Sequence, residues 1–342
     1  MPRSWHLSPD EPVLDELDRF VVVRKVAISV ARMAAVVLAV TFVTFAALNF
    51  LGDPLFNILG PIAEADPADL SDQERSDIAE AQELYHLDDP FIVRYGQWLG
   101  DVVQGDFGRS FKNGTTVSSL LSQRFPITIT LMVLAQIIAL AVSVPWALFA
   151  ASRAYQRSDK VSTVISFAML GIPVFALSVI LFWLFSVRLN IFPTRYNDDN
   201  FGTRIWSLLL PAIVLATPLV AIYQRLLRTD LVSTLQEDFI AMARAKGLPR
   251  WRILVRHALR PSLFSLITVF GIQTGALIGG SLVVETYFTL PGIGAAIVEA
   301  IIRDDFPVVL AAIVVISVFF VVTNFIVDLL YSFLDPRVRI DG

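Results

Sequence analysis

Six stretches of this chain are each long and apolar enough to cross a lipid bilayer as a single helix. A hydrocarbon core about 30 Å thick requires roughly 20 apolar residues at the helical rise of about 1.5 Å per residue. The six runs lie at residues 26–50, 127–151, 161–187, 205–222, 262–284 and 308–334. Because 55% of the residues are hydrophobic and only 17% are charged, a water-soluble fold would leave much apolar surface exposed. The sequence therefore predicts an all-α integral membrane protein with six transmembrane helices.

The first run has a second interpretation, as a cleavable signal peptide. The apolar part of a signal peptide is about 7–15 residues long and follows a short basic segment, whereas this run is longer and begins only at residue 26. No small-x-small cleavage site stands out after it. We therefore interpret 26–50 as a true first transmembrane helix, preceded by an N-terminal extension over residues 1–25.

The basic residues are divided unequally between the two sides that six spans would separate. Of the 27 Lys and Arg residues, 17 lie on the side of both termini, nine lie on the other side, and Arg32 falls within the first span. Short cytoplasmic loops carry an excess of positive charge in membrane proteins. Both termini, including the tail at 336–342, are therefore predicted to be cytoplasmic in a protein of the cell membrane.

Residues 51–125 connect the first two runs and form the predicted external segment. They hold thirteen of the 31 acidic residues but only five of the 27 basic ones. Within them, residues 68–86 have the spacing of a polar amphipathic helix, with Leu70 and Ile78 on its apolar side. Two interpretations remain open, a solvated acidic segment and a contact surface for an external partner.

The longest predicted cytoplasmic connection spans residues 223–261 and carries eight basic residues. Its first half predicts a helix over 237–246, with acids at the start and bases at the end, as suits the helix dipole. Gly247 follows as the expected left-handed residue beyond the helix C-terminus. Pro249 then favours the start of a second helix, which we expect to stop before Pro261.

This second helix would have two unlike faces. Arg252, Arg256 and Arg260 recur at every fourth residue and form a stripe of like charge. Another face is apolar and requires a groove; its side chains are Trp251, Leu254, Val255 and Ala258. The helix could lie on anionic lipid headgroups or dock a cytoplasmic partner, and the spacing alone fits both.

Several short motifs occur at intervals along the chain. The cytoplasmic loop carries Ala241-Met242-Ala243-Arg244-Ala245-Lys246-Gly247 and then His257-Ala258-Leu259-Arg260. The other motifs are Gly52-Asp53-Pro54, Leu87-Asp88-Asp89-Pro90, Gly105-Asp106-Phe107-Gly108-Arg109-Ser110, Arg124-Phe125-Pro126, Pro291-Gly292-Ile293-Gly294, Asp305-Phe306-Pro307 and Leu334-Asp335-Pro336. Together they make residues 24–339 resemble the permease subunits of ABC importers, in the dipeptide/oligopeptide (B-type, binding-protein-dependent) group. Ala241 departs from the general EAA motif of such loops, which has glutamate there.

The resemblance implies a type I ABC importer permease fold, with a permease domain over 126–335, an EAA coupling hairpin and an external segment between the first two spans. It also implies partners, namely a second homologous permease subunit, two ATPase subunits, an external solute-binding protein and a peptide substrate. The residues implied in ATPase coupling are Glu237, Asp238, Ala241, Ala243, Arg244, Ala245, Lys246, Gly247, Trp251, Leu254, Arg256 and His257. Because the chain has no Gly-x4-Gly-Lys-Ser/Thr motif, we expect it to bind no cofactor, and ATP and Mg²⁺ would be held by the partner ATPases.

Small and polar residues within the last two spans are candidates for lining a translocation path or for packing helices. They are Gln273, Thr274, Gly271, Gly275, Gly279, Asn324 and Asp328. The three glycines are four residues apart, a ladder that favours close helix packing over a path-lining role. Asp328 is a functional candidate because an acid within a membrane span is costly, although its place near the end of the span favours a hydrogen bond between helices.

An enzyme and a self-sufficient carrier are the other classes of function. His6, His86 and His257 lie in three separate segments and there is no cysteine, so no metal site is expected. A secondary carrier predicts inverted repeats and charges at the bilayer midplane, and neither is evident. The net charge of −4 disfavours nucleic-acid binding. The predicted function is an importer permease for short peptides, or for another solute of related systems such as a nickel chelate, glutathione or an oligosaccharide.

Overall fold

The computed structural model describes residues 11–51, 70–84 and 89–334, together with Leu55, Ile62, Ala63 and Ala65. The described residues are mostly helical, and the only extended pairing among them is an isolated bridge between Arg109 and Thr116. The elements are α1 (Glu11–Leu51), α3 (Asp72–Leu84), α4 (Phe91–Val103), α5 (Val117–Ser152), α6 (Arg157–Gly171), α7 (Val174–Leu181), the π-helix η2 (Phe182–Arg188), α8 (Phe201–Thr234), α9 (Asp238–Ala245), α10 (Arg250–Arg252), the π-helix η3 (Ile253–Ala258), α11 (Leu259–Tyr287), α12 (Ile293–Ile302) and α13 (Phe306–Leu334).

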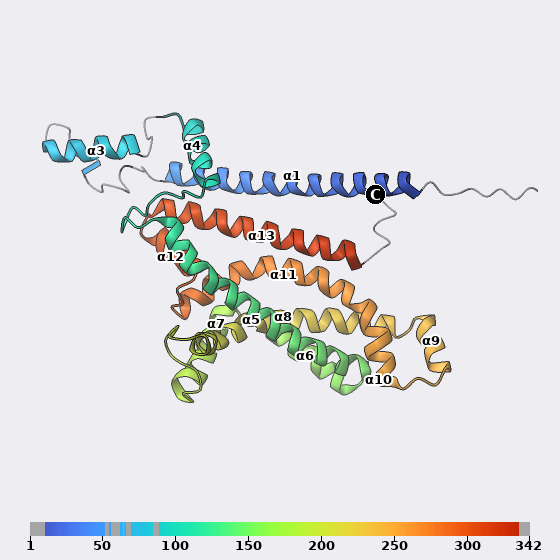
Figure 1. Ribbon diagram of the computed structural model, residues 1–342. Coiled ribbons are helices and arrows are strands. Elements are labelled where there is room, and N and C mark those ends of the chain that lie inside the picture. Colours follow the sequence, from blue (N-terminus) through green and yellow to red (C-terminus); the bar gives the residue numbers. More distant parts are fainter. Residues whose placement is uncertain are drawn as a thin grey trace, which may run out of the picture.

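Five of the described helices are long and apolar enough to cross a membrane, and a sixth crossing requires α6 and α7 to count as one broken span. The candidate spans are Val30–Phe50, Val117–Ser152, Phe201–Thr234, Arg250–Tyr287 and Phe306–Val327. Figure 1 shows α9 at one end of the long helices and α12 and α4 at the other, and we call these the α9 end and the α12 end. The predicted all-helical membrane fold is confirmed.

The third apolar run, residues 161–187, is predicted as one span, and in the structure it is broken into two helices at Gly171-Ile172-Pro173. α6 ends at Gly171, α7 starts at Val174, and the two are bent by 99°. Pro173 explains the break, because proline disfavours the helical conformation of the residue before it, and Ile172 is extended with φ −87° and ψ 119°. Each half has 15 residues, about 22 Å of helix, which is less than the hydrocarbon thickness of about 30 Å.

The main core lies where α5 packs against α8. Leu131 of α5 and Leu208, Leu215 and Tyr223 of α8 are fully or almost fully buried there. α8 continues to Thr234, well beyond the apolar run at 205–222. Polar residues in this extension have partners in α6, so the helix does not need to end where its apolar residues do.

At the α12 end, α4 packs against α1 through aromatic rings. The ring centroid of Phe45 lies 5.5 Å from those of Phe91 and Tyr95 and 5.7 Å from that of Trp98. The hydroxyls of Tyr95 and Thr41 are 3.0 Å apart. α3 occupies Asp72–Leu84 within the predicted amphipathic helix at 68–86. Among its described residues, the segment after the first run therefore contains α3 and α4, and α4 is fixed to α1.

Some predictions fall on residues that the structure does not describe. α1 begins at Glu11 and so includes part of the predicted N-terminal extension at 1–25. Residues 1–10, the motif Gly52-Asp53-Pro54 and the predicted tail at 336–342 lie outside the described residues. The side chain of Asp328 is also outside them.

Candidate functional site

Gly247 forms the turn of a hairpin at the α9 end. The N–H of Gly247 donates to the Arg244 carbonyl at 2.9 Å as α9 ends, and Pro249 precedes α10. Gly247 has a φ of +76°, a conformation that a residue without a Cβ adopts at little cost. No atom lies within 4 Å of the place where its Cβ would be. The backbone conformation, and not packing within this chain, therefore requires the glycine.

The second helix of the hairpin does not stop before Pro261, as the sequence predicts. α10, η3 and α11 run as one unbroken helix of 38 residues. Within it, η3 is π-helical, and the N–H of Leu259 reaches the carbonyl of Leu254, five residues back. The proline is tolerated because its missing N–H falls next to this irregular turn, where the usual bonding pattern is already shifted. The hairpin is therefore continuous with a candidate membrane span.

Part of the hairpin is packed into this chain's own core. Ile240 is fully buried, Ala243 and Leu254 are about as deeply buried, and Ala258 is also fully buried. η3 contacts α5, α8 and α9, so the groove that its apolar face requires is provided by the chain itself. Ala243 and Leu254, both predicted to couple to an ATPase, therefore hold the hairpin in place and are not at the surface.

The other residues predicted for coupling are accessible. Exposed are Glu237, Asp238, Ala241, Arg244, Ala245, Lys246, Gly247, Trp251 and Arg256, whereas His257 is half-buried. Large apolar side chains are exposed in the same segment, by 44% at Phe239, 62% at Met242 and 67% at Trp251. We define the hairpin surface as Phe239, Met242, Arg244, Lys246, Arg250, Trp251, Arg252 and Arg256. Apolar side chains exposed among bases are typical of a surface that meets a partner.

Two hydrogen bonds tie the hairpin to the end of α8. The Arg244 guanidinium donates to the Leu235 carbonyl at 3.2 Å, and the hydroxyls of Thr234 and Ser262 are 3.2 Å apart. A cavity of about 410 Å³ lies beside these contacts. Its lining residues are Ala151, Ala154, Tyr155, Val232, Leu235, Gln236, Glu237, Ala241 and Arg244.

An ion pair that was not predicted from the sequence joins α6 to α8 near the same end. The Arg228 guanidinium makes two hydrogen bonds to the Asp159 carboxylate, one of them 3.0 Å long. The Asp159 side chain is only 5% exposed, and it also accepts from the N–H of Tyr155 at 2.8 Å. One turn further along, Gln224 of α8 accepts from the hydroxyl of Ser166 at 2.7 Å. These contacts fix the α6–α8 pair close to the hairpin.

Thr274, one of the predicted path residues, belongs to a chain of hydrogen bonds inside the bundle. Gln136 of α5 donates to the Thr274 hydroxyl at 2.8 Å, and the Tyr223 hydroxyl of α8 donates to Gln136 at 2.8 Å. Gln136 and Tyr223 are buried. Three helices are therefore joined by polar contacts in an apolar surrounding, where such contacts hold helices in one register. Gln273 is half-buried beside Thr274 on α11.

The three predicted ladder glycines do not share one role. A Cβ on Gly271 would lie 2.5 Å from a methyl of Val327 on α13, and a Cβ on Gly275 would meet the ring of Phe320 on the same helix. Gly279 is exposed and has no atom within 4 Å of its Cβ position. Gly271 and Gly275 therefore allow α11 and α13 to approach closely, whereas Gly279 is left at the surface of the described chain.

Of the two predicted polar residues in the last span, only one has a described side chain. Asn324 is half-buried and donates to the carbonyl of Phe320, one turn earlier, at 2.9 Å. This bond stays within α13 and joins no second helix. The contacts of Asp328 remain a prediction.

A buried carboxylate at the end of α11 caps the short helix α12. Glu285 is fully buried, and its Oε2 accepts from the N–H of Ala295 at 3.2 Å in the first turn of α12. The N–H of Ile293 donates to the Thr128 hydroxyl of α5 at 2.9 Å. A Cβ on Gly294 would lie 2.6 Å from the backbone of Leu282, so the glycine allows this approach. Ile293 and Gly294 belong to the Pro291-Gly292-Ile293-Gly294 motif of the sequence, from which no role followed by spacing alone, and Glu285 was not predicted.

Comparison with known families gives one match that covers more than half of the chain. Residues 143–340 match the family described as the binding-protein-dependent transport system inner membrane component. The match includes α6 to α13 and the last ten residues of α5, and so contains the hairpin and the Asp159–Arg228 ion pair, whereas Gln136 lies before it.

Individual proteins are similar over nearly the whole length. The oligopeptide transport system permease protein AppB of Bacillus subtilis (strain 168) is 39% identical over 311 residues, which cover 89% of this chain and 95% of that protein. The dipeptide transport system permease protein DppB of Alkalihalophilus pseudofirmus (strain ATCC BAA-2126 / JCM 17055 / OF4) is 32% identical, with 89% and 96% covered. A probable peptide ABC transporter permease protein of Sinorhizobium fredii (strain NBRC 101917 / NGR234) is 35% identical, with 84% and 90% covered.

A solved structure has a related fold. A chain of the MetNI methionine ABC transporter, in an inward-facing conformation, superposes with a TM-score of 0.54 at 15% sequence identity. The superposition covers 63% of this chain and 96% of that chain. At this identity the likeness concerns the fold alone, and it agrees with the type I importer permease architecture predicted from the sequence.

Proposed function

The chain belongs to the binding-protein-dependent transport system inner membrane components, and from this premise we propose that it moves short peptides across the cytoplasmic membrane. It is a multi-pass permease subunit of an ABC importer and not itself a catalytic enzyme. Relatives of 32% to 39% identity are named for oligopeptide and dipeptide transport, which supports the peptide substrate. A nickel chelate, glutathione or an oligosaccharide is the alternative cargo.

The hairpin surface carries the proposal, as the site where an ATPase subunit docks. Trp251 and Met242 are more than half exposed, and the neighbouring bases would favour a cleft with an acidic rim. The α9 end is then cytoplasmic, in agreement with the excess of Lys and Arg on that side. ATP and Mg²⁺ would be held by the two ATPase subunits, and this chain would hold neither.

The continuity of the hairpin with α11 supplies a route for coupling. A displacement of α10 moves η3 and α11 as one helix, and α11 carries Thr274 and the glycine contacts to α13. Because packed helices change between discrete arrangements, motion at the hairpin would change the packing of the span and open the path to alternate sides. A second permease subunit would complete the path, and an external solute-binding protein would deliver the peptide at the α12 end.

Reconstitution tests the proposal. The complex of this chain with its partner permease, ATPases and binding protein is placed in proteoliposomes, and uptake of labelled peptide and ATP hydrolysis are measured. We expect peptide to stimulate both, and Trp251→Asn to reduce uptake by at least tenfold. Tyr155→Asn is the matched control, because Tyr155 is 73% exposed at the same end outside the hairpin.

Two results would contradict the proposal at different points. Uptake that persists without the ATPase subunits would replace the importer by a self-sufficient carrier. Stimulation by a metal chelate and not by any peptide would leave the importer in place and overturn the substrate.

A further inference from the structure

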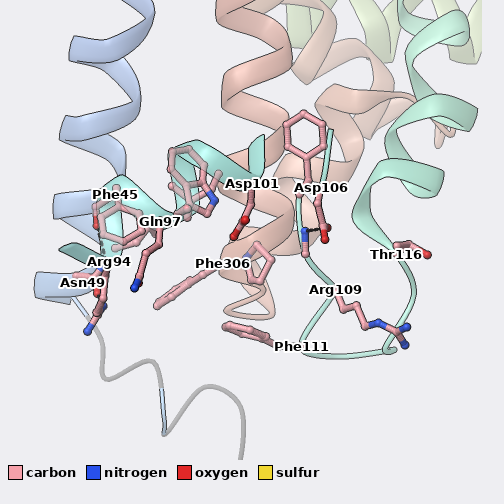
Figure 2. Close-up of a pocket in the computed structure, with 16 residues that line it drawn as sticks. Phe45, Asn49, Arg94, Gln97, Asp101, Asp106, Arg109, Phe111, Thr116 and Phe306 are labelled. Atoms are coloured by element: carbon pink, nitrogen blue, oxygen red, sulfur yellow. Dashed lines mark hydrogen bonds between the residues drawn. The ribbon is translucent and has the colours of Figure 1, made fainter. Parts of the chain in front are cut away.

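A cavity of about 440 Å³ opens at the α12 end, among α1, α4, the segment 104–116 and the start of α13. Figure 2 shows its lining, with Phe306 near the centre and Arg94 and Asn49 together at one edge. Its volume falls within the range of about 300–1,000 Å³ that is typical of ligand pockets. Most of the lining is apolar, and the apolar side chains include Phe45, Leu48, Trp98, Phe107, Phe306 and Leu310. The cavity is therefore able to hold one or two side chains of a partner.

The charged side chains that line this pocket differ in their hydrogen-bond partners and in where they point. Arg94 is bonded to Asn49 of α1, and Arg109 points away from the centre in Figure 2. Asp101 and Asp106 are both exposed and are held next to each other, because the N–H of Asp106 donates to the Asp101 carbonyl at 2.9 Å. The Asp101 carboxylate has no hydrogen-bond or ion-pair partner among the described residues. The pocket therefore has carboxylates beside aromatic side chains.

The loop that forms one wall is connected to the transport core. The Asp305 carboxylate, directly before α13, accepts from the Ser110 hydroxyl and from the N–H of Phe111 at 3.0 Å. The next residue, Phe306, lines the pocket. A segment inserted there would touch both the loop and the first turn of α13.

From these observations we infer that the pocket receives a projecting segment of the external solute-binding protein, one that carries a basic side chain beside an apolar one. The inference rests on the proposed function, because binding-protein dependence comes from the family. Charge complementarity selects this occupant. Of the four charged lining residues, Arg94 is bonded to Asn49 and Arg109 points away, so a basic side chain, and not the phosphate of a lipid headgroup, would meet favourable charge at Asp101 and Asp106. An apolar anchor in a pocket flanked by an ion pair is a typical centre of an interface.

The experiment measures binding of the peptide-loaded binding protein to the complete transporter in nanodiscs. The variants are Asp101→Lys and the neutral pair Asp101→Asn with Asp106→Asn, which keeps the acceptor used by the N–H of Gly108. Asp198→Lys is the control, an exposed acid in the loop before α8 at the same end. We expect Kd to rise at least tenfold for both pocket variants and less than twofold for the control. A Lys→Glu or Arg→Glu change in the docking segment should restore affinity toward Asp101→Lys.

Each other result overturns the inference. An unchanged Kd in both pocket variants removes it and leaves the proposed function intact, provided that the wild-type complex is still stimulated by the binding protein. A lower unfolding temperature with an unchanged Kd means that the two acids stabilise this chain and do not dock a partner. If the pocket variants lose the stimulation of ATP hydrolysis by free peptide in the absence of binding protein, the pocket is a substrate subsite. If the wild-type complex binds no binding protein at all, the proposed function and this inference fall together.

Discussion

The ion pair between Asp159 and Arg228 allows a sharp test of how the α9 end is held together. Arg228→Met removes the guanidinium but keeps most of the apolar stem, so the change concerns charge more than volume. The Asp159 side chain is 5% exposed and that of Arg228 is 22% exposed. Loss of the arginine leaves a buried carboxylate whose remaining partner is the N–H of Tyr155.

The size of the effect follows from burial. Breaking a buried pair by removing one partner costs about 3–5 kcal/mol, and the partial exposure of Arg228 puts the expectation near the lower end, at about 3 kcal/mol. Adding Asp159→Asn removes the stranded charge and keeps an acceptor for Tyr155. The double variant should therefore lose only about 1 kcal/mol, the net worth of a typical hydrogen bond, which makes it more stable than Arg228→Met alone.

The assay is reversible unfolding by SDS in mixed micelles, followed by tryptophan fluorescence. Arg225→Met is the matched control, because Arg225 is one turn away and lies over the Phe167 ring at 4.2 Å, a contact worth about 0.5–1 kcal/mol at an exposed site. A cost of Arg228→Met no larger than that of Arg225→Met, or a double variant less stable than the single one, would show that the ion pair does not hold α6 to α8.

Three further predictions concern glycines and the buried carboxylate. Gly247→Val should lower the free energy of unfolding by about 1–2 kcal/mol, because valine is strained at a left-handed φ, and should reduce peptide-stimulated ATP hydrolysis. Gly247→Asn should retain most of this hydrolysis, and equal rates in the two variants would contradict the prediction. Gly271→Leu should lower the free energy of unfolding in SDS by about 1–3 kcal/mol through overpacking, while Gly279→Leu, at an open position, should change it by less than about 0.5 kcal/mol. Glu285→Ala should lower the free energy of unfolding by about 1–2 kcal/mol, because α12 loses its cap, and should speed hydrogen exchange of the α12 amides as measured by mass spectrometry. Glu285→Gln should leave this exchange slow. Similar exchange in the wild type and both variants would refute the cap.

Local features were predictable because they depend on a few consecutive residues. The all-helical membrane fold follows from the length and apolarity of the runs. The turn of the hairpin follows from Gly247, whose φ of +76° is the conformation expected beyond a helix C-terminus. A break before Pro173 is readable from the proline itself, but its angle of 99° depends on how α6 and α7 pack against their neighbours, among them α8.

The surface of the hairpin could be predicted only in part. Spacing placed Trp251 and Leu254 on one apolar face, yet Trp251 is 67% exposed and Leu254 is buried. The π turn of η3 changes the angular position of residues along the helix, and α5 and α8 cover the side that carries Leu254. Neither effect is encoded in the spacing of a regular helix.

By itself, the sequence determined that this protein is a helical membrane permease with one basic hairpin, because hydropathy, charge and motif order are properties of short segments. The cytoplasmic side of that hairpin is a prediction from the charge bias. The tertiary structure decided which polar groups meet. Asp159 and Arg228 are 69 residues apart, and Gln136 and Thr274 are 138 apart. Such pairs depend on the packing of α5, α6, α8 and α11 in space, and a pattern along one helix carries no information on the helix that will lie beside it.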